Sequence, residues 1–226
     1  MARFSIAALG FAALWLAVAL GAQAAASALL DGDDNVLALK CGRRVPVTAP
    51  APVTPLVPVE VVLAIDDEWQ AHFGSDAERE ARLVATRAAS HYRNLGIHVL
   101  PTRVVTWESP DSAATLPELL DHADAADLLQ GEDVALVFTA QHVDGTEDGD
   151  ATVGGQSAIV RHHAGHGSQD EFVLAHEIGH VFGAHHGCDV SGLAGLMADR
   201  GIEQPVRLCP CTRRAIETNV ARFHDT

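Results

Sequence analysis

Basic residues are scarce in this chain of 226 residues. Lys and Arg together number 15 against 30 Asp and Glu, so the formal net charge is −15 at pH 7. An acidic surface of this kind is repelled by the phosphates of nucleic acids and by anionic membranes. The composition therefore argues against nucleic acid as a partner, and against membrane contacts beyond the export signal described next.

Charge is missing altogether from residues 4–20, which form an apolar run directly after Arg3. Residues 22–24 read Ala-Gln-Ala and fit the small-x-small cleavage pattern, so we predict a signal peptide over residues 1–24. The alternative is an uncleaved membrane anchor, for which the run is only marginally long. Export would place the protein in the periplasm or outside the cell, where disulfides persist.

Internal repeats are also lacking. About 200 residues remain after the signal, which suits one compact domain. Within residues 25–58, a Pro-rich passage from Pro46 to Pro58 favours an extended linker over a packed helix. We therefore expect a leader, or a short propeptide with its linker, over residues 25–58 and a folded domain over residues 59–226.

Cysteine is limited to four residues, of which Cys41 lies in the leader and Cys188, Cys209 and Cys211 lie near the C-terminus. In an oxidising compartment we expect a disulfide from Cys188 to Cys209 or Cys211. Three complete pairings of four cysteines are possible, and the sequence does not choose between them.

The sequence of residues 176–186 reads H-E-x-x-H-x-x-G-x-x-H. Positions i and i+4 share one face of a helix, so His176 and His180 can bind one metal ion, while Glu177 can reach a water on it. Gly183 can take positive φ, end the helix and turn the chain so that His186 becomes a third ligand. Three protein nitrogens and one open position are typical of a catalytic zinc site.

This motif resembles that of the metzincin zinc endopeptidases. That clan has a Met-turn beneath its metal, and residues 195–198 (Gly-Leu-Met-Ala) are similar to it, with Met197 one of only two methionines. Residues 59–66, 133–139 and the C-terminal segment resemble the adamalysin (reprolysin) branch. One departure is Gly187, where adamalysins usually have Asp. The only tyrosine, Tyr92, is far from the Met-turn in sequence, so the resemblance implies no tyrosine in the astacin-like role.

The same resemblance gives Cys41 a second interpretation. Some metzincin proenzymes carry a Cys-Gly segment whose thiolate occupies the open zinc position, and Lys40-Cys41-Gly42 is similar to it. Cys41 is therefore either an inhibitory cysteine switch or part of a structural disulfide.

The resemblance implies an α/β fold of the metzincin type, with a twisted mixed sheet, an antiparallel edge strand, a zinc helix, a Met-turn and a C-terminal helix. The residue patterns predict strands at 59–65, 97–107 (broken by Pro101), 133–139 and 156–160. They predict helices from the capping box at Ser75 to Leu95, over 115–130, over 169–182 and after residue 207. In metzincins the strand before the zinc helix is the sheet edge, which implies that residues 156–160 form it.

Two loops have further interpretations. The loop over residues 141–155 is rich in Gly and Asp, and Asp144, Glu147, Asp148 and Asp150 could bind Ca²⁺, although a solvated acidic loop is the alternative. The His-rich residues 162–167 form either a second metal site or a loop near the cleft.

We therefore expect an exported zinc endopeptidase that acts on protein or peptide substrates. It would hydrolyse internal peptide bonds through a zinc-activated water, with Glu177 as general base. The alternative is a catalytically silent zinc-binding domain that interacts with proteins on a protease scaffold. The oligomeric state does not follow from the sequence.

Overall fold

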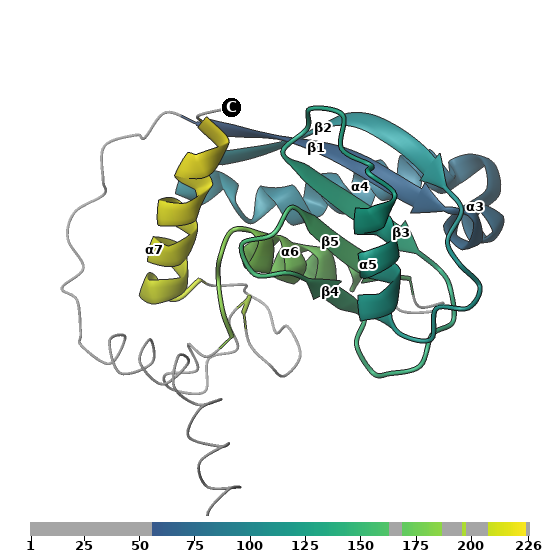
Figure 1. The fold of residues 1–226 in the computed structure, drawn as a ribbon. Helices are drawn as coiled ribbons and strands as arrows, with labels where there is room; N and C mark the ends of the chain where they lie inside the picture. The colour runs from purple at the N-terminus through teal and green to yellow at the C-terminus, as the bar shows by residue number, and fades with distance from the viewer. Residues whose placement is uncertain (1–55, 163–168, 187–195, 198–207, 225–226) are drawn as a thin grey trace, which may run out of the picture. The chain divides into compact units, whose positions relative to one another are not determined.

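The strands of this protein come from runs of β-branched and apolar residues, and they form one five-stranded sheet (Figure 1). The computed structural model describes residues 56–162, 169–186, 196–197 and 208–224. Its strands are β1 (Val57–Asp66), β2 (Ile97–Trp107), β3 (Val134–Thr139), β4 (Gly149–Ala151) and β5 (Ser157–Arg161). The predicted signal peptide and residues 25–55 of the predicted leader, with Cys41, lie outside the described residues, as does Cys188. The folded domain was predicted to begin at Val59, but Val57 and Pro58 already belong to β1.

The sheet has the order β2-β1-β3-β5-β4. The pairs β1–β2, β1–β3 and β3–β5 are parallel, and β4 pairs with β5 in the antiparallel direction. Parallel neighbours need crossover connections, which the intervening helices supply. The predicted α/β fold, with a mixed sheet and an antiparallel edge strand, is confirmed.

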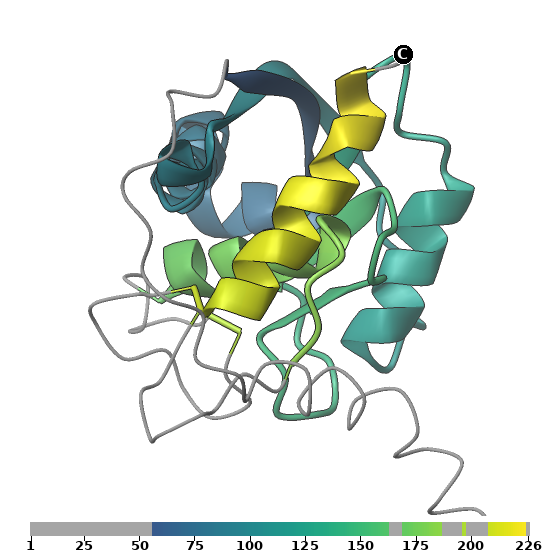
Figure 2. The ribbon, with the colours of Figure 1, turned by 90° about the vertical axis from the view of Figure 1, so that its left-hand side faces the viewer.

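The helices are α3 (Asp67–Phe73), α4 (Ala77–Ser90), α5 (Leu116–Ala125), α6 (Asp170–Val181) and α7 (Pro210–Asn219), with 3-10 turns η2 (Gly74–Asp76), η3 (Arg93–Leu95) and η4 (Val220–His224). Helices α4 and α6 cover one face of the sheet, and α5 covers the other (Figure 2). No helix in the described part of the chain is long and apolar enough to cross a membrane.

Alternate strand residues supply the two apolar cores that these helices complete. Leu63, Phe138 and Val160 belong to the larger core beneath α4 and α6, whereas Ala64 and Val137 belong to the core beneath α5. Successive side chains of a strand point to opposite faces, so a sheet covered on both sides needs apolar residues in an unbroken run. This is why β3 is buried at all six positions.

The edge strand differs from the expectation. Strand β5, the predicted strand before the zinc helix, lies inside the sheet between β3 and β4. The edge is β4, three residues within the segment that we expected to be an acidic loop. Strand β4 has no β-branched residue, so its extended conformation rests on pairing with β5 and not on local propensity.

Two further boundaries also differ. Pro101 does not break β2, because β2 is itself an edge strand and Pro101 lies beside a register shift opposite Val61 and Val62. An edge strand with a bulge tolerates a residue that lacks an N–H donor. The expected capping box at Ser75 is replaced by η2, and α4 begins at Ala77 and ends at Ser90.

Candidate metal centre

Helix α6 spans Asp170–Val181, close to the predicted bounds, and carries the H-E-x-x-H part of the longer motif. Asp170 and Glu171 lie in its first turn, where negative charge favours the N-terminal end of a helix. After the helix, Gly183 has φ of +83° and turns the chain back toward α6. This left-handed residue brings His186 to the face that carries His176 and His180.

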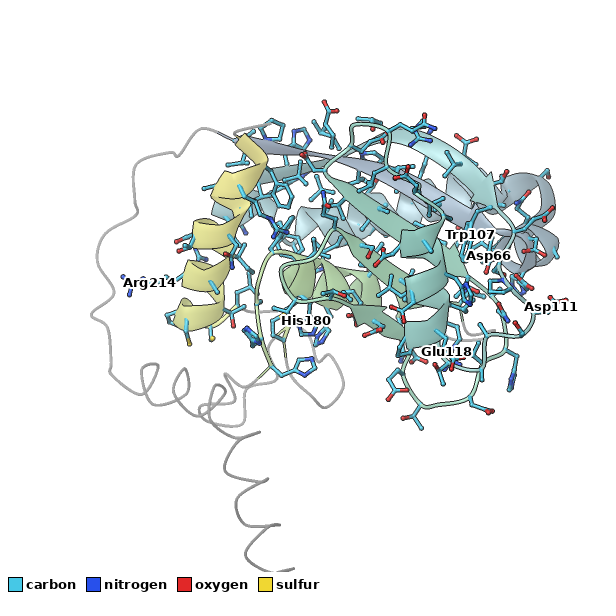
Figure 3. The ribbon with its side chains drawn as sticks, in the orientation of Figure 1. Asp66, Trp107, Asp111, Glu118, His180 and Arg214 are labelled. Atoms are coloured by element: carbon cyan, nitrogen blue, oxygen red, sulfur yellow. The ribbon has the colours of Figure 1, made fainter. Side chains whose placement is uncertain are left out.

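The three imidazoles meet at their Nε2 atoms. The Nε2 atoms of His176 and His180 are 3.1 Å apart, and each lies 2.8 Å from Nε2 of His186. His180 is buried, His176 is half-buried and His186 is exposed, so the cluster opens to solvent on one side. Figure 3 shows His180 projecting from α6 toward this site.

Backbone carbonyls fix which nitrogen of each helical histidine carries the proton. Nδ1 of His176 lies 2.6 Å from the Leu196 carbonyl oxygen, and Nδ1 of His180 lies 2.8 Å from that of Ala184. A carbonyl oxygen only accepts, so each Nδ1 donates and each Nε2 presents a lone pair. Burial is the main cause that lowers the pKa of His180 to about 4, which keeps this ring neutral and able to bind a metal.

The arrangement of these lone pairs shows whether the site fits a cation. Nε2 of His176 and Nε2 of His180 are both acceptors, so they cannot hydrogen-bond each other at 3.1 Å. An ion at the usual Zn–N distance would hold tetrahedral nitrogens about 3.3 Å apart, close to the separations here. The residues present therefore fit zinc, with Nε2 of His176, His180 and His186 as its ligands.

Glu177 lies between α6 and the edge strand. Its side chain is almost completely buried, and a Cβ atom built on Gly149 of β4 would lie only 2.8 Å from Cγ of Glu177. Burial, followed by the nearby Asp150 carboxylate, raises the pKa of Glu177 to about 8. A bound cation would favour the ionised carboxylate and oppose this shift. Glu177 is thus a buried carboxyl group with a raised pKa, and it lies against β4, the strand that borders the site.

Met197 lies beneath α6, as the resemblance implied. It is buried, and a Cβ atom on Gly179 would collide with its sulfur. Gly179 thus lets the two segments approach closely, and the Leu196 carbonyl beside Met197 orients His176. The second contact beneath Gly179 is Tyr92, whose hydroxyl donates to the Ala175 carbonyl.

A family model described as metallopeptidase family M12 (Reprolysin_5) matches residues 57–222. The chain belongs to this metallopeptidase family. The three-histidine cluster is consistent with the zinc site of such a metallopeptidase.

The fold of this metallopeptidase is also similar to a solved structure described as a chaperone–substrate complex. The TM-score is 0.58 at 16% sequence identity, and the match covers 75% of this chain and 35% of that chain. At this identity the similarity shows the fold alone. The metallopeptidase spans about a third of the length of the chain it matches.

The two other predicted metal sites are not supported in the described residues. Within them, only the three-histidine cluster brings together three or more His, Cys, Asp or Glu side chains close enough to bind an ion. Of the acidic loop, Asp148 pairs with Arg161 at 3.5 Å and Asp150 lies in β4. His162 hydrogen-bonds Asp170 at 2.6 Å, whereas residues 163–168 lie outside the described part.

The two C-terminal cysteines of the metallopeptidase lie where α7 begins. Cys209 is the N-cap residue of α7, and its Sγ atom lies 3.3 Å from Sγ of Cys211. An S–S bond is about 2.05 Å long, so these two cysteines are not bonded to each other. Neither of them is free.

Four residues around the site were not predicted from the sequence, namely Tyr92, Gly149, Asp150 and Arg222. Each is distant from residues 176–186 in the chain and reaches α6 only through the fold. Burial raises the pKa of the Tyr92 hydroxyl well above its usual value, so it remains a donor to α6. The sequence held no signal for Gly149, because Asp148-Gly149 is a dipeptide typical of a turn.

Proposed function

We propose that this metallopeptidase is an exported zinc endopeptidase in which Glu177 is the general base. The proposal rests on one observation: the Nε2 atoms of three histidines converge, and the helix that carries two of them also carries a buried glutamate, Glu177. Zinc bound there would act as a Lewis acid and make a water nucleophilic near neutral pH.

Glu177 is suited to move the proton in this reaction. A general base must be ionised before it can accept a proton, and a bound cation would favour the ionised form of this buried carboxyl group. One carboxylate oxygen would take the proton of the attacking water and then deliver it to the leaving amine. The packing of Gly149 against Glu177 holds the carboxylate in place, which keeps the distance to the substrate short.

Strand β4 supplies the surface that would hold the substrate. Among the described residues, it is an outer strand of the sheet and is paired on one side, with β5. An extended peptide can add to such an edge through main-chain hydrogen bonds, whatever its side chains. A substrate strand on β4 would pass near Glu177, because a Cβ atom on Gly149 of β4 would lie 2.8 Å from Cγ of that residue.

Export and the cysteines belong to the same proposal. We propose that residues 1–24 are removed as a signal peptide, that residues 25–56 form the leader and that Cys188 pairs with Cys209 or Cys211. Cys209 and Cys211 are not bonded to each other, so either of them can be the partner of Cys188. Cys41 is then either an inhibitory cysteine switch or part of a structural disulfide.

The substitution Glu177→Gln tests the role of the base in the full chain. It removes the basic oxygen and retains the shape, so we expect cleavage of an unfolded protein substrate to fall about 10²–10⁴-fold. Zinc content, measured by atomic absorption, should stay at one ion per chain. The matched control is Glu171→Gln on the same helix, which should cleave at the rate of the wild type.

Two outcomes would contradict the proposal. Undiminished cleavage by Glu177→Gln would assign the proton transfer to another group. A wild type that holds one zinc ion and cleaves nothing would instead favour the silent zinc-binding domain.

A further inference from the structure

Arg222, in η4, joins the turn after β4 to the end of α6. Its guanidinium donates to the carbonyl oxygens of Gly154, Gly155 at 2.7 Å and Val181 at 2.9 Å. Gly154 and Gly155 belong to the turn that follows β4, and Val181 is the last residue of α6. One side chain thus connects the edge strand to the end of the zinc helix.

The chemistry of Arg suits this position. The last carbonyls of a helix have no partner within it and carry partial negative charge, which a cation stabilises. The planar guanidinium presents several donors in a fixed fork, so it can serve three carbonyls at once. A hydrogen bond of 2.8 Å from the Gly154 N–H to the His180 carbonyl joins the same two segments directly.

The surroundings of Arg222 hold it over this junction. Its guanidinium lies 4.6 Å from the centre of the Phe223 ring, and the Phe223 and Phe182 rings are 5.9 Å apart. Asn219, one turn earlier, packs against Gly183 at the turn that brings His186 to the cluster. The C-terminal segment therefore contacts the end of α6 and the turn after it through Asn219, Arg222 and Phe223.

We propose that Arg222 is a positioning residue that sets the distance between the substrate-binding edge β4 and the metal ligands. It touches neither ligands nor substrate, and acts by holding the turn after β4 on the carbonyl end of α6. This inference rests on the proposed peptidase function, because it gives β4 the role of substrate edge. Without the guanidinium, the Gly154–His180 hydrogen bond would be the backbone link that remains between the two segments within the described residues.

The test compares Arg222→Met with Arg214→Met in the full chain. Arg214 is an exposed arginine of α7 that projects away from His180 (Figure 3), so it controls for loss of a charge in the same region. Two peptides are needed, one long enough to pair along β4 and one with two residues on each side of the cleaved bond. A general structural defect would lower the cleavage of both peptides by the same factor.

For Arg222→Met we expect kcat/KM for the long peptide to fall about tenfold more than for the short one, mainly through KM. Arg214→Met should change neither. Arg222→Lys should recover part of the loss, since one ammonium can reach some of the three carbonyls. Equal losses for both peptides, or no loss, would overturn the positioning role.

Two measurements do not depend on turnover. In a Glu177→Gln background, Arg222→Met should weaken the affinity for the long peptide about tenfold. The Gly154 amide should exchange its hydrogen faster, because the turn that carries it is no longer held. Unchanged exchange would overturn the clamp even if no substrate were found, whereas a wild type that neither cuts nor binds peptide would overturn the proposed function.

Discussion

Asp66 is a carboxyl group in an unusual place, at the carboxyl end of β1 and far from His180 (Figure 3). It is completely buried, and its Oδ1 atom accepts the Trp69 N–H at 2.7 Å as the N-cap of α3. Burial is the main cause that raises its pKa to about 7, while hydrogen bonds from Thr139 and the Trp69 N–H oppose the shift. The sequence predicted none of this, because an Asp after a strand is ordinarily read as a turn residue.

This raised pKa predicts how the stability of the protein depends on pH. The folded chain binds the Asp66 proton more tightly than the unfolded chain, so the stabilisation is complete below about pH 4 and is lost as pH rises through about 7. Asp66→Asn keeps the N-cap acceptor and does not titrate. Between pH 5 and pH 8 we expect the free energy of unfolding of Asp66→Asn to rise by about 2–4 kcal/mol relative to the wild type.

Urea unfolding at the two pH values, with disulfides intact, measures this difference. The control is Asp124→Asn, which removes the same charge from an exposed position of α5 and should not show the rise. If the difference between Asp66→Asn and the wild type were the same at both pH values, the buried carboxyl would be ionised throughout.

The turn after α6 is the element on which the third metal ligand depends. Gly183 has φ of +83°, and a Cβ atom there would collide with the Asn219 side chain on α7. The turn after α6 therefore packs closely against α7 at Gly183, a position where only glycine is free of strain. The sequence predicted the turn, whereas the neighbour that closes around it became visible only in the fold.

Gly183→Ala should lower the free energy of unfolding by about 1–3 kcal/mol, through backbone strain and the clash with Asn219. It should also weaken zinc binding about tenfold, because His186 is displaced. Thermal unfolding and a competitive zinc indicator measure the two effects. The double variant Gly183→Ala/Asn219→Ala relieves the clash alone and should recover only part of the loss, so complete recovery would show that φ is not the cause.

The sequence predicted helices and strands well where the local residue pattern was strong. Strand β3 and residues 61–65 of β1 are continuous apolar runs, which a strand covered on both faces requires. Helix α6 has an acidic first turn and is followed by Gly183 at positive φ. Strand β4 was missed because its three residues are Gly, Asp and Ala, which favour a loop when taken alone. The effect of Pro101 was misjudged because it depends on β2 being an edge strand, which is a property of the sheet.

At the scale of the whole molecule, the proposed disulfide would link separate parts of the chain. If Cys188 bonds to Cys209 or Cys211, the unreduced protein should have a mass lower by two hydrogens for that disulfide. Proteolysis without reduction should release the Cys188 peptide linked to the peptide that holds both Cys209 and Cys211. Peptide mapping by mass spectrometry measures both, and a Cys188 peptide released alone would contradict the proposed pairing.

The same mapping distinguishes the two interpretations of Cys41. A cysteine switch predicts that Cys41 is alkylated once zinc is chelated, without any reductant. A Cys41 that is alkylated only after reduction would instead favour the structural disulfide.

The metal ligands could be predicted from the sequence because they lie within eleven residues of one another, over positions 176–186. Their surroundings could not. Tyr92 beneath α6, Gly149 against Glu177 and Arg222 over the helix end come from three separate parts of the chain, and only the parallel sheet with its crossovers brings them together. A motif therefore identifies the chemistry, while the packing that tunes it is a property of the fold.

Because the three histidines lie close together in the sequence, they should also come together early in folding. Segments of about ten residues close within about 100 ns, whereas parallel strands joined by long crossovers pair slowly. During folding, we therefore expect the histidines to meet long before β1 and β3 complete the parallel part of the sheet. The chain should then be able to hold a metal ion before its sheet is complete.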